Sequence, residues 1–321
     1  MKRFALVLST ATVFMAVTCC AQGNYPEKTV RLIVGFPAGS TADAAARLVG
    51  EKLRESLGKP VIVENVVGVG GNLAMDRAAK APPDGYTLAL AGNGQLTINP
   101  YLYKVSFEPV RDFVAVSQIY SSASLLVVNP SVPAQTLQQL LRLARSRPGE
   151  LTYASGGIGS APHIAAELLK NMAGIQMHHV PYKGIVAAIP DLIAGRIAMT
   201  IGPISQVLPA LQDGRIRVLA VSSLKRWPRL PDVPTIDEAG VPGYDATIWA
   251  GLVAPAATPA AIIEKVYTES AKALASRDMR EKLADLGMEA IGNRPQEFAG
   301  LIRSELGKWG KVIASSTIKV E

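Results

Sequence analysis

Cysteine is almost absent from the sequence. The chain has 321 residues and two cysteines, Cys19 and Cys20, which are neighbours close to the N-terminus. The rest of the chain therefore cannot form a disulfide within itself. A chain of this length buries enough apolar surface to be stable without cross-links, and it is long enough to favour two lobes over a single core.

Charged and aromatic residues are also scarce. Charged residues make up 18% of the chain and aromatic residues 6%, whereas 49% of the chain is hydrophobic. Disordered proteins have the opposite composition, and few aromatic rings are available to stack on nucleic-acid bases. The formal charge of +7 comes from basic residues scattered along the chain. We therefore expect a globular protein that binds no nucleic acid.

Long hydrophobic runs are missing, apart from one near the N-terminus. Residues 4–17 are apolar, follow Lys2 and Arg3, and lead into a short stretch that ends at Ala21. The run is shorter than the ~18–20 residues of a transmembrane helix. The pattern predicts a secretory signal peptide over residues 1–21. A lipoprotein anchored through Cys19 or Cys20 is the alternative, and in both cases the protein is exported.

The rest of the chain alternates short β-branched runs with segments of helical periodicity. This order predicts an α/β fold in which mostly parallel sheets are flanked by helices. The expected strands cover residues 30–35, 61–64, 87–91, 125–128, 178–180, 197–201 and 218–222. The expected helices include residues 41–57, 137–146, 164–172, 186–194 and 262–275.

Two glycine-rich turns, one in each half of the chain, predict two similar lobes that face each other. Residues 34–41 and 153–163 each end a strand and open a helix. From Thr258 onward we expect helices without convincing strands, packed on the first lobe. The predicted division is residues 22–122 and 248–321 for the first lobe and 123–247 for the second, with crossings near 121–124 and 245–250.

Residues for common catalytic and cofactor chemistry do not occur in the required patterns. Ser160 lacks the G-x-S-x-G surroundings of an α/β-hydrolase nucleophile, and only the nearby His163 keeps an exported hydrolase as an alternative. A strand would point His178 and His179 to opposite faces, so we expect one to be packed inside and the other exposed. No metal-binding motif, complete G-x-G-x-x-G sequence or Walker A sequence is present. We therefore expect no metal, no cofactor and no catalysis.

What remains is the capture of an anion by backbone groups. A glycine-rich turn that opens a helix presents free N–H groups and the positive end of the helix dipole. Ser40, Thr41, Ser155 and Ser160 add hydroxyl donors or cap these helices, and a third turn at residues 91–95 adds two amide side chains. The alternative is that all three are ordinary capped turns.

Asp43 lies in the first turn of the expected helix at residues 41–57. A carboxylate there suits the helix dipole and accepts hydrogen bonds from loop N–H groups, so we favour a capping role. Direct contact with an ammonium or hydroxyl group of a ligand is the alternative.

Short blocks along the whole mature chain point to a known family. In their order and spacing, these blocks resemble the Bug family, the periplasmic solute-binding proteins of tripartite tricarboxylate transporters. The blocks are Tyr25-Pro26-Glu27-Lys28, Arg31-Leu32-Ile33-Val34, Phe36-Pro37-Ala38-Gly39, Glu64-Asn65, Gly70-Gly71-Asn72, Pro83-Asp84-Gly85-Tyr86-Thr87, Tyr153-Ala154-Ser155, Val180-Pro181-Tyr182-Lys183-Gly184, Leu230-Pro231-Asp232-Val233-Pro234-Thr235, Pro242-Gly243-Tyr244 and Trp249 with Gly251-Leu252.

The resemblance implies a clamshell protein of the periplasm. It would capture a small organic carboxylate between its lobes and present it to membrane permease subunits. Closure would bring both helix N-termini onto one carboxylate, and we expect a monomer. A ligand sensor built on the same cleft is the alternative function. The residues that the resemblance places at the ligand are Phe36, Ala38, Ser40, Thr41, Asp43, Asn93, Gln95, Thr97, Ser155, Gly156, Gly157, His163 and Tyr182.

The sequence departs from the family pattern at two places. Val66-Val67 stand where many relatives have Arg-Pro, which we expect to alter only the surface. Residues 201–205 read Ile-Gly-Pro-Ile-Ser where relatives often have an Asp or Asn facing the cleft. We expect this change to make the far side of the pocket less polar, and to favour a monocarboxylate or an aromatic or cyclic acid over a short dicarboxylate.

Overall fold

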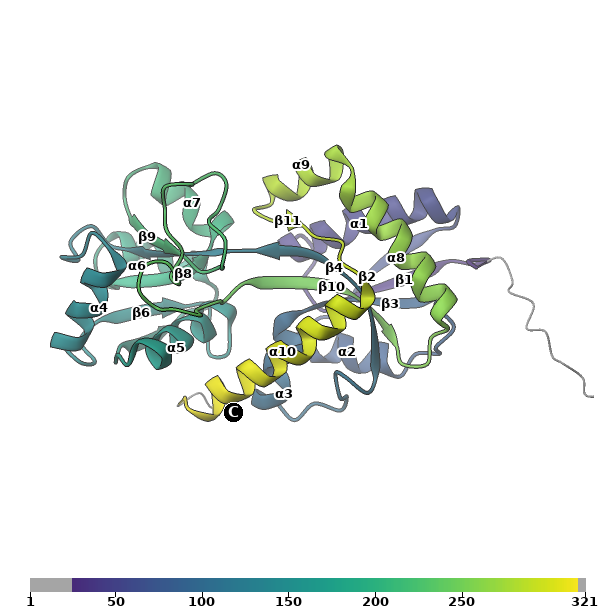
Figure 1. The fold of residues 1–321 in the computed structure, drawn as a ribbon, viewed down its shortest axis with the longest axis horizontal. Helices are drawn as coiled ribbons and strands as arrows, with labels where there is room; N and C mark the ends of the chain where they lie inside the picture. Colours follow the sequence, from purple (N-terminus) through teal and green to yellow (C-terminus); the bar gives the residue numbers. More distant parts are fainter. Residues whose placement is uncertain (1–24, 317–321) are drawn as a thin grey trace, which may run out of the picture.

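The computed structural model describes residues 25–316, which form two β-sheets covered by helices (Figure 1). The six-stranded sheet has the strand order β11-β4-β10-β3-β1-β2, and we call this sheet with its helices the first lobe. The five-stranded sheet of the second lobe has the order β7-β6-β8-β5-β9. The predicted α/β class and two-lobed architecture are confirmed. The predicted signal peptide lies outside the described residues, among which no helix is long and apolar enough to cross a membrane.

The first lobe has an apolar layer on each face of its sheet. Helices α1, α8 and α9 enclose one apolar cluster, and α2 and α10 enclose another. The strands are β1 (Val30–Val34), β2 (Val61–Asn65), β3 (Thr87–Gly92), β4 (Phe113–Ser122), β10 (Ile248–Pro255) and β11 (Glu289–Ala290). The helices are α1 (Thr41–Leu57), η1 (Val69–Gly71), α2 (Asn72–Ala79), the π-helix η2 (Gly94–Ile98), α3 (Asn99–Leu102), α8 (Ala260–Ala275), α9 (Arg277–Asp285) and α10 (Pro295–Ala314).

The second lobe repeats this layered arrangement on a smaller scale. Helices α4 and α5 cover one face of its sheet, and α6 and α7 cover the other. The strands are β5 (Ser124–Val128), β6 (Thr152–Ser155), β7 (His178–Pro181), β8 (Met199–Pro203) and β9 (Arg217–Val221). The helices are α4 (Leu137–Ser146), α5 (Ala161–Ala173), α6 (Ile185–Ile193) and α7 (Ile204–Gln212).

Two strands carry the chain between the lobes. β4 leaves the first lobe and continues through Ala123 into β5, and the segment after β9 returns as β10 (Figure 1). Because β10 is antiparallel to both β3 and β4, the strands β1 and β3 run in the direction of β4, toward the second lobe. β8 is antiparallel to β5, and β6 and β7 follow β8, so these strands run toward the first lobe. The carboxyl ends of β1, β3, β6 and β7 therefore face one another across the crossing.

The last helix connects the lobes a third time. Phe298 near the start of α10 belongs to an apolar cluster of the first lobe, whereas Trp309 near its end belongs to the cluster that contains Leu168 and Leu169 of α5. The Nδ2 atom of Asn171 on α5 also donates to Ser315 Oγ at 2.8 Å, just beyond the end of α10. The expected helical stretch is thus present, but it includes the two-residue strand β11. We expected this stretch to pack on the first lobe alone, but the end of α10 packs on the second lobe, because the apolar side of this helix extends past the first sheet.

Gly251 provides a test of the packing between β10 and α10. A Cβ atom at this position would lie 2.5 Å from Cε1 of the buried Phe298 ring and 2.6 Å from the carbonyl oxygen of Ser117. We predict that Gly251→Ala lowers the free energy of unfolding by about 2–3 kcal/mol through overpacking, as measured by urea denaturation. Gly300→Ala is the control, because its Cβ meets open space within α10. Equal losses in the two variants would contradict this account.

Candidate ligand-binding site

The structure divides the predicted site residues into two groups on facing ends of the lobes. The turns after β1 and β3 carry the first group, and the turns after β6 and β7 carry the second. Some side chains of these turns bond only their own lobe, and others remain exposed on the facing ends.

The turn after β1 is held in place by Asp43. One carboxylate oxygen accepts the Gly39 N–H at 2.9 Å and the Arg47 Nε–H at 3.0 Å, and the other accepts Asn65 Nδ2–H at 2.8 Å. Burial opposes the charge, but these bonds outweigh it and lower the pKa of Asp43. The side chain is 3% exposed. It therefore makes the contacts expected of a capping residue, with Asn65 and Arg47 as supporting residues that the sequence analysis did not assign to the site.

Other residues of this turn remain available to the cleft. Ser40 is the N-cap of α1, and its Oγ accepts the Asp43 N–H at 3.2 Å. Ala38 and Thr41 are exposed and Phe36 is half-buried. The N–H group of Thr41, at the first position of the helix, has no acceptor within α1. This turn thus presents a small, open surface with a backbone donor.

The side chains of the turn after β3 are turned inward. Asn93, Gln95 and Thr97 are buried, and they lie in or next to the π-helix η2. Gln95 Oε1 accepts the Gly92 N–H at 2.6 Å, Thr97 Oγ1 donates to Asn93 O at 2.7 Å, and Asn93 Nδ2 donates to Thr247 O at 3.3 Å. In this conformation the three side chains bond the backbone of the first lobe and support the wall of the cleft.

The turn after β6 leads into a helix without a side-chain cap. Ser160 is the N-cap of α5, but its Oγ donates to Gly157 O at 2.7 Å and accepts nothing from the helix. The N–H groups of Ala161 and His163 belong to the first turn and have no acceptor within α5. Gly156 and Gly157 are partly exposed, whereas Ser155 is fully buried beneath them. Free backbone donors at this end of the second lobe therefore point to an anion site.

The histidines do not form a catalytic pair with Ser160. His163 is 5% exposed, and its Nδ1 accepts the Gly159 N–H at 3.0 Å. His179 is partly buried and stacks on His163, with ring centroids 3.9 Å apart, whereas His178 is exposed. This confirms the expectation that one of the adjacent histidines is packed and the other exposed. The Ser160 hydroxyl bonds the Gly157 carbonyl at 2.7 Å, so Ser160 makes no nucleophile–base contact with His163.

Tyr182 lies beyond β7, where its hydroxyl donates to Asp191 Oδ2 at 2.5 Å on α6. Burial, followed by the hydrogen bond to Asp191, raises the pKa of Tyr182 to about 12. The phenol therefore stays neutral at physiological pH. The Tyr182 backbone lies beside the turn that contains Gly156 and Gly157, because the Tyr182 N–H donates to Ser155 O at 3.1 Å.

The expectation that residues 201–205 line a less polar pocket is wrong for its two isoleucines. Ile201 is completely buried, and Ile204 is 1% exposed. Ile201 lies in β8, between β5 and β6 in the sheet, and belongs to the apolar layer under α4 and α5. Ile204 is the first residue of α7 and belongs to the apolar layer on the other face. Val67, in contrast, is 53% exposed, as expected for a surface position. Pro203 is half-buried and Ser205 is exposed, and the preference for a monocarboxylate or an aromatic or cyclic acid stays a prediction.

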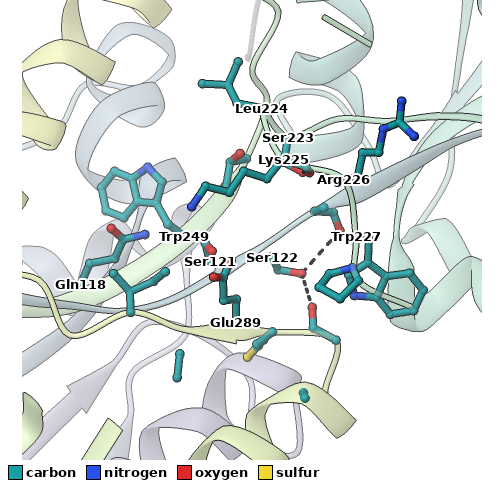
Figure 2. Close-up of a pocket in the computed structure, with 18 of the residues that line it drawn as sticks. Gln118, Ser121, Ser122, Ser223, Leu224, Lys225, Arg226, Trp227, Trp249 and Glu289 are labelled. Atoms are coloured by element: carbon teal, nitrogen blue, oxygen red, sulfur yellow. Dashed lines mark hydrogen bonds between the residues drawn. The ribbon is translucent and has the colours of Figure 1, made fainter. Parts of the chain in front are cut away.

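A separate cavity of about 660 Å³ lies at the crossing between the lobes (Figure 2). Ser121 and Ser122 of β4 and Glu289 of β11 line one side, and residues 223–229 after β9 line another. None of the predicted ligand residues lines it. β11 and β3 flank the crossing strands on opposite sides, so this cavity and the paired turns occupy opposite sides of the crossing. Its shape depends on the angle between the lobes, since both contribute to its wall.

The fold and its facing turns define the chain as a two-lobed binding protein. It belongs to the family described as the tripartite tricarboxylate transporter family receptor, which matches residues 45–318. The similarity to the Bug family is thereby confirmed. Protein BugT of Bordetella pertussis is 32% identical over 303 residues, which cover 93% of this chain and 92% of BugT. A UPF0065 protein in the tcbD-tcbE intergenic region of Pseudomonas sp. strain P51 is 39% identical over 90% of this chain and 86% of that protein.

Two similar solved structures contain small carboxylates. Rpa4515 of R. palustris with adipate is 38% identical, has a TM-score of 0.77, and is matched over 90% of this chain and 97% of its own. MatC (Rpa3494) of Rhodopseudomonas palustris with bound malate is 32% identical, has a TM-score of 0.74, and is matched over 90% and 100%. Two relatives of this chain thus have solved structures with a small dicarboxylate.

The buried histidine generates a prediction for stability against pH. Burial, followed by the neighbouring His179, lowers the pKa of His163 from 6.5 to about 4. Between these values the unfolded chain binds a proton that the folded protein does not bind, so stability falls as the pH drops from 6.5 to 4. We expect this residue to lower the free energy of unfolding by at most about 3 kcal/mol over this pH range. Thermal unfolding across this range should show a shallower decline in His163→Asn, and identical slopes would contradict the assignment.

Proposed function

We propose that this protein is an exported receptor that captures a small carboxylate between its lobes and delivers it to a membrane transporter. Its family and the carboxylates present in Rpa4515 and MatC support this function. The periplasm is the proposed location, a monomer the proposed state, and membrane permease subunits the proposed partners.

The observation that carries the proposal is the uncapped N-terminus of α5, on the end of the second lobe that faces the first. Its free N–H groups at Ala161 and His163 have no side chain to satisfy them, because the Ser160 hydroxyl is bonded elsewhere. A carboxylate oxygen accepts such N–H groups and interacts favourably with the positive end of the helix dipole. An unsatisfied helix terminus therefore gains a partner when the ligand binds.

The first lobe supplies the second half of the site. Ala38, Ser40 and Thr41 border the N-terminus of α1, and the facing strand directions place them opposite the turn at Gly156 and Gly157. We assign these five residues, together with the Ala161 N–H of α5, to direct contact with the ligand. Phe36, Asp43, Asn93, Gln95, Thr97, Ser155, His163 and Tyr182 are assigned to the walls and supports of the cleft, with backbone contact through the His163 N–H.

Capture follows from closure of the two halves. With the lobes apart, a carboxylate reaches the donors of only one lobe. Bringing α1 and α5 onto the same anion adds the second set of donors, and the closed state gains stability equal to this difference in affinity. The closed surface then differs from the open one, which allows a transporter to recognise the loaded receptor.

Thermal shift and calorimetric titration with adipate, malate, succinate and benzoate test the proposal. A ligand at 100 times its dissociation constant adds about 2.7 kcal/mol of stability, which raises the Tm by several degrees. We expect at least one acid to do so. A purified protein that is free of bound ligand and responds to none of these acids or to a wider acid panel would contradict the proposal.

Ala161→Pro tests the role of the α5 terminus. Proline is tolerated at the first position of a helix and removes one of the two free N–H donors. Loss of a hydrogen bond to a charged group predicts affinity about tenfold weaker or more for the acid that binds. Ala260→Pro makes the same change at the first position of α8 and should leave the dissociation constant unchanged. Similar affinities for wild type, Ala161→Pro and Ala260→Pro would show that the N-terminus of α5 does not hold the carboxylate.

A further inference from the structure

Three aromatic rings form a stack beneath the turn after β6. The ring of Tyr153 on β6 lies 4.9 Å from that of His179 on β7, and His179 lies 3.9 Å from His163 on α5. The two histidine planes differ by 11°. The stack joins two strands and a helix at the base of the turn, and Tyr153 is completely buried.

The edges of the two imidazole rings hold the backbone of the turn. His163 Nδ1 accepts the Gly159 N–H at 3.0 Å. His179 Nε2 is 2.6 Å from Ser155 Oγ, and that hydroxyl accepts the Gly157 N–H at 3.1 Å. Two of the turn's N–H groups thus point inward, toward the imidazoles and the serine.

The backbone of the turn needs this support because it is strongly bent. Gly157 and Gly159 have φ values of +119° and +74°, which non-glycine residues rarely adopt. Between them, Ile158 is 51% exposed. With Gly157 and Gly159 anchored below, the first turn of α5 is left with its own free N–H groups facing the cleft.

We propose that His163 and His179, as neutral imidazoles, are positioning residues that fix the turn after β6 so that the free N–H groups of α5 meet the ligand. This inference rests on the proposed function and adds to the same site the residues that position its backbone donors. A proton on Nδ1 of His163 would remove the acceptor of the Gly159 N–H, and the turn would lose one of its two anchors.

The charged and titratable groups around the stack favour the neutral state. Glu167 of α5 accepts the Tyr153 hydroxyl at 2.6 Å and the Lys170 ammonium at 2.6 Å. Lys170 therefore offsets the carboxylate that would otherwise attract a proton to the rings. The exposed His178 precedes His179 on β7. Burial is the main cause that lowers the pKa of both His163 and His179, and two stacked imidazolium ions would repel each other.

The experiment replaces each ring nitrogen by an amide oxygen. Asn places an acceptor near the position of Nδ1, and Gln places one near Nε2. For adipate and malate measured by calorimetry at pH 7, we expect His163→Asn to bind within about threefold of wild type and His163→Leu to bind about tenfold more weakly or worse. His179→Gln and His179→Leu should show the same order. Circular dichroism and thermal melts establish that each variant is folded. If His163→Leu does not fold, His163→Gln takes its place.

The nitrogen chemical shifts of the histidine rings provide a readout without ligand. We expect His163 to remain neutral, with its proton on Nε2, at pH 5.5. The Gly159 amide should exchange faster in His163→Leu than in His163→Asn. A protonated Nδ1 at pH 5.5, or equal binding and exchange in these two variants, would overturn the inference. A wild-type protein that binds no carboxylate contradicts the proposed function instead, and the ring shifts and Gly159 exchange then still decide whether the histidines position the turn.

Discussion

The pairing of β4 with β10 is the constraint on which the site depends. These antiparallel strands cross from one lobe to the other, and their register joins Trp249 to Ser121 and Ile248 to Ser122. The strand directions around them place the carboxyl ends of β1 and β3 in the first lobe opposite those of β6 and β8 in the second. Helices α1 and α5 begin just beyond β1 and β6, so each has the positive end of its dipole on the side of its lobe that faces the other lobe.

The turns after β1 and β6 look alike in sequence, but different side chains bond their backbone N–H groups. Ser40 caps α1 in the usual way, and Asp43 ties the turn to Asn65 and Arg47. In the second lobe the corresponding hydroxyl of Ser160 bonds a carbonyl, and imidazoles secure the turn from below. Both helices nevertheless keep two first-turn N–H groups without an acceptor in the helix, those of Thr41 and Ala42 in α1 and those of Ala161 and His163 in α5. The two lobes thus differ in how the turn is held, and each retains backbone donors.

Local sequence patterns predicted the individual elements better than the side-chain directions in the site. The helices at Thr41–Leu57 and Leu137–Ser146 were predicted with the observed bounds, because their caps and apolar periodicity are local signals. The long strands β4 and β10 were not predicted, since their pattern reflects burial from two lobes. The inward turn of Gln95 follows from the π-helix η2, and the burial of Ile201 follows from the central place of β8. The place of β8 depends on strands distant in the chain, whereas Gln95 bonds Gly92 only three residues away, in a π-helix that the residue pattern did not indicate.

The bridging helix α10 has a consequence for how the chain folds during its synthesis. β10 occupies an interior position of the first sheet although it begins at Ile248, and Trp309, near the other end of α10, lies in the core of the second lobe. An emerging chain that stops short of β10 lacks a strand in the first sheet, and one that stops short of Trp309 lacks part of the second core. Both lobes therefore complete their native packing only when nearly all of the protein has been translated, which couples them into one late folding event.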